Sequence, residues 1–123
     1  MSTIKQIAPE DWQPGNIVDI ALISPKPNDL QVLCEIRFHQ DTDDLDDFDV
    51  AYLQIPGGAR YMLTKHKRTS ELGTKVWADI QLERDYQLAT LALVRVLGLD
   101  PAVILWVAER GTYNFLIQEP DEC

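Results

Sequence analysis

The most distinctive feature of this chain is a group of six aspartates within nine positions. They are Asp41, Asp43, Asp44, Asp46, Asp47 and Asp49, and no lysine or arginine lies among them. Clustered carboxylates repel one another, so they need solvent, a cation or a basic partner nearby. The stretch could therefore hold a metal ion, contact a basic protein or form a solvated loop.

Ligand spacing decides against a calcium loop. The EF-hand pattern needs oxygen ligands at positions one, three and five, glycine at six and glutamate at twelve. Counted from Asp41, positions five and six are Leu45 and Asp46, and a start at Asp44 places Phe48 at position five. Neither frame fits, so we assign no metal ligand. A solvated loop, or a helical turn with Leu45 and Phe48 packed inward, is the simpler interpretation.

The two histidines are the other candidates for acid–base chemistry. His39 precedes the aspartates, and His66 lies in the basic run 65–68. A histidine next to carboxylates can act as a general base. However, the chain contains no GxSxG, HExxH or CxxC motif and no phosphate-binding glycine loop. We therefore name no catalytic residue and no cofactor, and leave open whether the protein is an enzyme.

The formal net charge of −9 narrows the range of partners. A negative excess argues against general affinity for nucleic acid or an anionic membrane, and is compatible with a basic protein partner. A basic segment that includes Arg60 and Lys67, with Tyr61 nearby, could contact phosphates and stack on bases. The neighbouring aspartates would repel the same nucleic-acid backbone, so we do not favour this alternative.

Length and composition indicate one domain over residues 1–123, with an N-terminal extension at 1–15 and an acidic tail at 119–123. A hydrophobic content of 46% is ordinary for a globular core. Cys34 and Cys123 do not make a disulfide framework. No apolar leader is evident, and charged residues, glycine and proline interrupt the most apolar region. We therefore expect a cytoplasmic protein without a membrane span.

The elements that must position these residues follow from the period of the apolar side chains. Alternation predicts strands near 17–23, 30–39, 49–55, 59–65 and 74–82. A turn is expected at 24–29, and Gly57 and Gly58 provide the positive φ angles of a tight hairpin. In 74–82 the apolar side chains share one face, and Trp77 lies on the other.

The period of the apolar residues changes in the C-terminal third of the chain. Residues 84–97 have the composition of a helix that Gly98 ends. Residues 102–110 are expected to form a second short helix, although their β-branched run is also compatible with a buried strand. A last strand is expected at 112–118. The predicted fold is α+β: a mainly antiparallel meander sheet of five to six strands, with one to two C-terminal helices packed on one face.

The opposite face of this sheet is expected to carry Leu33, Tyr52 and Trp77. We expect the N-terminal segment with Trp12 to cover these side chains, because large exposed apolar patches are uncommon in monomers. The helix at 84–97 and the run around Trp106 offer more apolar surface than one sheet face needs. A homodimer with two-fold symmetry is therefore expected.

Two functional hypotheses follow. The first is a small acidic domain that binds another macromolecule without catalysis, as an adaptor, inhibitor or immunity-type protein. The aspartate stretch and Trp77 would form its contact surface. The alternative is a small enzyme or small-ligand-binding protein with a pocket between the sheet and the helices, and with His39 or His66 at its mouth.

Overall fold

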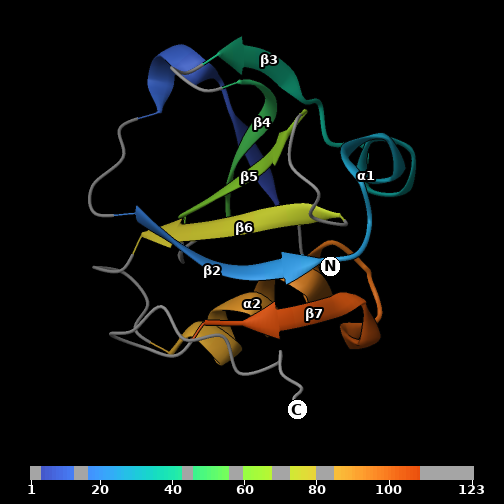
Figure 1. The fold of residues 1–123 in the computed structure, drawn as a ribbon. Coiled ribbons are helices and arrows are strands. Elements are labelled where there is room, and N and C mark those ends of the chain that lie inside the picture. The colour runs from blue at the N-terminus through green and yellow to red at the C-terminus, as the bar shows by residue number, and fades with distance from the viewer. Residues whose placement is uncertain are drawn as a thin grey trace.

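The structure, a computed structural model, describes residues 4–12, 17–42, 46–55, 60–67, 73–79 and 85–108. Within them the chain forms a mostly antiparallel seven-stranded sheet with two α-helices, an α+β fold (Figure 1). The elements are β1 (Lys5–Ile7), η1 (Pro9–Asp11), β2 (Ile17–Ile23), α1 (Pro27–Cys34), β3 (His39–Thr42), β4 (Asp47–Gln54), β5 (Arg60–His66), β6 (Thr74–Asp79), α2 (Tyr86–Val96), η2 (Pro101–Val103) and β7 (Ile104–Val107), where η marks a 3-10 helix.

The strand order differs from a simple meander. The order is β1-β4-β5-β6-β2-β7, and β3 also pairs with β4. Strands β4, β5 and β6 are neighbours in sequence and in space, as predicted. Strand β2, however, lies between β6 and β7, and β1 and β3 pair with different halves of the same edge of β4. A meander is therefore correct only for the middle of the sheet.

The core lies between the sheet and α2, which is behind the sheet in Figure 1. The sheet contributes fully buried apolar side chains, namely Ala51, Leu53, Leu63, Val76 and Ala78, and α2 contributes Ala89, Leu93 and Val94. The hydroxyl of Tyr61 donates a 2.7 Å hydrogen bond to the backbone oxygen of Ala89. This bond fixes α2 on the sheet at a fully buried position, where water cannot replace it.

The helix expected at 84–97 is confirmed as α2, and its sequence explains its bounds. Asp85 is the N-cap, and its carboxylate accepts a 3.1 Å hydrogen bond from the backbone nitrogen of Leu88. Gly98 follows the last turn with a φ angle of +76°. A glycine adopts this left-handed conformation without a steric penalty, so the helix ends here.

The strand expected at 30–39 is wrong, since α1 occupies its first half. The backbone nitrogen of Lys26 donates a 3.0 Å hydrogen bond to the carboxylate of Asp29, which stabilises the first helical turn where we expected a loop. Only one face of α1 is covered: Leu30 is fully buried, whereas Leu33 is 65% exposed. Leu33 therefore does not lie on a sheet face, and the apparent alternation came from a helix followed by an extended segment.

The short helix expected at 102–110 is also wrong. Asp100 caps a single 3-10 turn through a 2.9 Å hydrogen bond from the backbone nitrogen of Ala102. The chain then continues as β7, which pairs with β2, so the strand alternative is the correct one. β-branched side chains favour this pleated pairing over another helical turn. As a result, α2 is the helix of the C-terminal third that covers the sheet.

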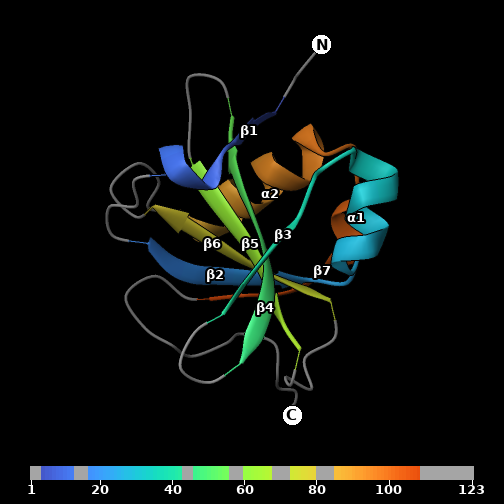
Figure 2. The same ribbon diagram turned by 90° about the horizontal axis from the view of Figure 1, so that it is seen from above.

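The other helix, α1, lies beside the sheet near the carboxyl end of β2 (Figures 1 and 2). No helix in the described part of the chain is long and apolar enough to cross a membrane. The expected Gly57–Gly58 turn, the strand at 112–118 and the tail at 119–123 lie outside the described residues, although the hairpin that joins β4 and β5 is confirmed by their pairing.

Candidate functional site

The sheet face opposite α2, called the front face here, carries several of the residues that sequence reasoning singled out, among them Asp41 and Trp77. Strand register shows which side chains share this face. They include Asp19 of β2, His39 and Asp41 of β3, Phe48 and Tyr52 of β4, Met62, Thr64 and His66 of β5, and Lys75 and Trp77 of β6. The front face thus combines aromatic rings with groups of both charges.

Two ring stacks lie on the front face. Trp12, which follows η1, stacks on Tyr52 with ring centroids 4.8 Å apart and an interplanar angle of 25°. Phe48 and His66 stack across β4 and β5 at 4.8 Å and 29°. All four side chains are half-buried. The expectation that Trp12 covers the outer aromatic residues is confirmed for Tyr52.

Trp77 lies on the front face as predicted, and its neighbours hold it in one orientation. Its indole Nε1 donates a 2.8 Å hydrogen bond to the hydroxyl of Thr64. The Nζ atom of Lys75 lies 5.8 Å from the ring centroid of Trp77 and 3.6 Å from the carboxylate of Asp19. The ring is therefore a fixed, half-buried surface next to an ion pair.

The aspartate stretch forms a β-hairpin and not a helical turn, within the part of it that is described. Asp41 belongs to β3 and lies opposite Phe48, on the front face. Asp49 lies opposite Lys65, on the other face. Because successive side chains of a strand point to opposite faces, the hairpin separates carboxylates that are close in sequence. Asp43 and Asp44 lie outside the described residues.

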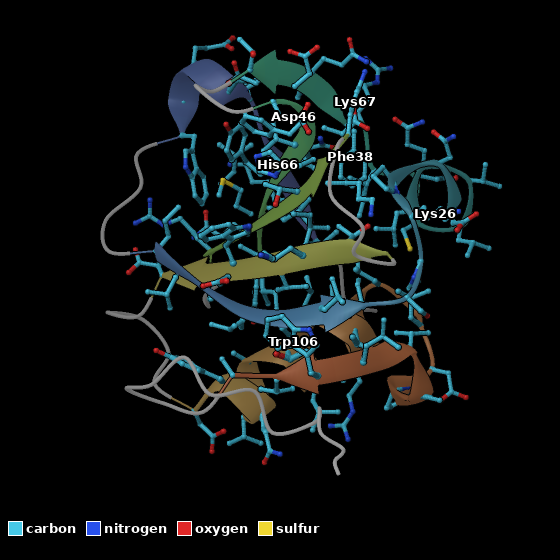
Figure 3. The ribbon with its side chains drawn as sticks, in the orientation of Figure 1. Lys26, Phe38, Asp46, His66, Lys67 and Trp106 are labelled. Carbon is cyan, nitrogen blue, oxygen red and sulfur yellow. The ribbon has the colours of Figure 1, made fainter. Side chains whose placement is uncertain are left out.

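Asp41 is exposed and lies on the same face as the aromatic rings. Burial raises the pKa of the Tyr52 phenol, and the negative charge of Asp41 raises it further. The carboxylate is therefore near enough to act on the ring that stacks under Trp12. Figure 3 shows Asp46, His66 and Lys67 at this same end of the sheet, well away from Trp106 on β7.

The two histidines lie on opposite sides of β4. His39 is opposite Val50, and His66 is opposite Phe48. Both point to the front face, but neither lies between the sheet and a helix, where a pocket was expected. His39 instead lines an open pocket of about 410 Å³ at the edge of the sheet.

This edge pocket lies where β1 and β3 meet along β4. One wall is formed by residues 6–10, and the other by Glu35, Arg37 and His39. Sequence reasoning missed the pocket because its walls are about thirty residues apart in the chain. One backbone feature marks the pocket in the structure. Glu35, directly after α1, is a non-glycine residue with a φ angle of +58°.

No group of three or more histidine, cysteine, aspartate or glutamate side chains in the described segments is placed to hold a metal ion. Comparisons with protein-family models, curated protein sequences and solved structures found no match. A function must therefore be argued from the surface itself: fixed aromatic rings, an adjacent carboxylate and an edge pocket.

Proposed function

We propose that this protein is a non-catalytic binding domain that recognises a basic segment of another protein. The contact surface is the front face around Tyr52 together with the acidic β3–β4 hairpin. One observation carries the proposal: Asp41 lies opposite Phe48 on the face that also carries Tyr52, so acidic and aromatic groups belong to one surface.

This combination suits lysine and arginine side chains. Their aliphatic stems pack on aromatic rings, and their charged ends reach carboxylates at the rim. The net charge of −9 would accelerate the encounter with a basic partner and would repel phosphate backbones. The hydrophobic rings supply contact area that an acidic loop alone would lack.

Because the half-buried rings are already stacked, the surface needs little rearrangement to bind. Trp12 and Tyr52 hold each other, and Thr64 holds Trp77. Binding then costs less side-chain entropy than it would for free rings. We propose that the interaction takes place in the cytoplasm, in line with two cysteines that do not form a disulfide framework.

The test is a titration with a defined peptide of alternating arginine and leucine, followed by backbone amide NMR shifts. Shifts are expected at Asp41, Phe48 and Tyr52, and the affinity should fall as salt is added. The variant Asp41→Asn, which keeps the oxygen that accepts a 2.8 Å hydrogen bond from Thr42, should weaken binding about tenfold.

The matched control is Asp100→Asn. It removes the same charge, and asparagine remains a good N-cap for η2, so the fold should be unaffected. Equal loss of binding in both variants would show that net charge alone explains the effect, and would contradict the proposed surface. Shifts confined to residues outside the front face and the hairpin would contradict it as well.

A further inference from the structure

The edge pocket presents both signs of charge to the same space. Glu10 and Glu35 lie on its two walls, and Arg37 lies on the second wall. All three side chains are exposed. Among the residues that the structure describes, none of these charged groups forms an ion pair or a side-chain hydrogen bond with another. Opposite charges that line one pocket without pairing leave room for a ligand that carries both.

The walls of the pocket are tied together through the backbone of Arg37. Its nitrogen donates a 2.9 Å hydrogen bond to Oε1 of Gln6, and Nε2 of Gln6 donates to its carbonyl oxygen. The amide side chain of Gln6 thus replaces a strand pair where β1 and β3 meet. The main chain of Arg37 is fixed, while its guanidinium is left for other contacts. Such a wall is organised before a ligand arrives.

Glu35 adds an independent sign of function. Within the described segments it is the only non-glycine residue with a positive φ angle, +58°. Glycine or asparagine adopts this conformation more easily after a helix, so a glutamate here strains the backbone. Within the described residues its side chain forms no hydrogen bond or ion pair that would stabilise α1. Strain that stability does not explain suggests a role for the side chain, which lines the pocket.

We propose that the edge pocket binds a free amino acid. The guanidinium of Arg37 receives the α-carboxylate, and the carboxylates of Glu35 and Glu10 receive the α-ammonium group. A simple anion would be repelled by the two glutamates, and a simple cation by the arginine. A volume of about 410 Å³ admits a molecule of this size.

The uncharged part of the lining indicates the side chain of the ligand. Ile7, Ala8 and Pro9 form the apolar portion of the first wall. An aliphatic side chain would cover these residues and exclude water from them. L-leucine is therefore the first probe. His39 belongs both to this pocket and to the front face, but the two proposals name different ligands, so either can fail without the other.

The experiment is an NMR titration of the full chain with L-leucine, N-acetyl-L-leucine and L-leucine methyl ester, each to about 10 mM, tenfold above a dissociation constant of about 1 mM. L-leucine should give saturable shifts at residues 6–10 and 35–39. Each derivative lacks one charge and should bind at least about tenfold more weakly, because one of the two charge contacts with the pocket is lost. Saturation by either derivative at the affinity of L-leucine would overturn the proposal.

The decisive variant is Glu35→Gly. Glycine relieves the positive φ angle, so the melting temperature should stay the same or rise, while the affinity for L-leucine should fall about tenfold or more. Asp100→Asn, which lies on η2, is the control and should bind as the unmodified protein does. Unchanged affinity in Glu35→Gly would overturn the proposal. If none of the twenty common amino acids gives a saturable shift, it is overturned as well.

Discussion

At the scale of single residues, two glycines are required for different reasons, a steric clash at one and backbone strain alone at the other. Both adopt positive φ angles, +91° at Gly73 and +76° at Gly98. A Cβ atom at Gly73 would lie 1.9 Å from the backbone oxygen of Ile23, whereas nothing lies within 4 Å of one at Gly98. Gly73 therefore allows β2 and the start of β6 to approach each other closely.

We expect Gly73→Ala to lower the free energy of unfolding by more than about 3 kcal/mol, because the backbone must move to relieve the clash. Gly98→Ala should cost only about 1 kcal/mol, the penalty of the left-handed conformation alone. Chemical denaturation of both variants measures the difference. Equal losses would contradict the close approach of Gly73 to Ile23.

Tyr52 provides a prediction about pH. Burial and the charge of Asp41 raise its pKa above the ordinary value of 10.0 in the folded protein. The unfolded chain then releases the phenolic proton first as the pH rises. The stability that Tyr52 contributes is complete below pH 10 and is lost as the pH rises through the folded pKa.

The phenolate absorbance of the folded protein tests this. Asp41→Asn should lower the pKa of Tyr52 while burial still keeps it above the ordinary value. Tyr52→Phe identifies its transition among the four tyrosines, and should lose less stability above pH 10 than the unmodified protein. A transition that Asp41→Asn leaves unchanged would contradict the electrostatic coupling between Asp41 and Tyr52.

At the scale of elements, α1 is attached to the fold through one face. Leu30 is fully buried in the core, whereas Val32 and Leu33 are 80% and 65% exposed. We expect Leu30→Ala to cost about 2–4 kcal/mol of unfolding free energy, from lost burial and the cavity that remains. Leu33→Ala should change it by less than about 0.5 kcal/mol. Val32→Ala should also change it by less than about 0.5 kcal/mol, whereas a strand with alternating burial would bury Val32 together with Leu30, so urea denaturation of this variant distinguishes the two structures.

The β3–β4 hairpin yields a prediction about calcium. Its strands direct Asp41 and Asp49 to opposite faces, so these carboxylates do not converge on one ion. Millimolar calcium and magnesium at equal ionic strength should therefore give the same melting temperature. Tight binding at a hundredfold excess over the dissociation constant would add about 2.7 kcal/mol of stability. A shift specific to calcium would contradict this prediction.

At the scale of the whole molecule, the expected homodimer stays a prediction. Several apolar side chains that suggested it are buried within a single chain, including Leu93, Val94 and Val107. The large apolar side chains that are exposed in the described segments are Val32, Leu33 and Leu88. A dimer would therefore have to cover these residues, on α1 and α2.

Sedimentation at micromolar concentration measures the state directly. A dimer should sediment at twice 14.0 kDa and dissociate in Leu33→Glu, which adds a charge to this surface without disturbing the core. The control Gln31→Glu adds the same charge to an exposed position of α1. A species of 14.0 kDa that does not change on concentration would rule the dimer out.

The sequence by itself determined the α+β class, four strands and the main helix. The strands at 17–23, 49–55, 59–65 and 74–82 were predicted correctly apart from their ends. Successive side chains of a strand point alternately to the core and to solvent, and this alternation is visible in the sequence. It also named Trp77 and the aspartates, since local composition is visible without a fold. The face of the sheet to which a strand residue of the candidate surface points could therefore be predicted.

Only the tertiary structure decided how these parts meet. The place of β2 between β6 and β7, the stack of Trp12 on Tyr52 and the edge pocket all join segments far apart in the chain. The period of apolar residues in the sequence indicates that a side chain is buried, but it does not indicate which residues cover it. The helix α1 was missed for the same reason: eight residues after its start, an extended segment takes over the apolar alternation, and only packing of Leu30 selects the helix.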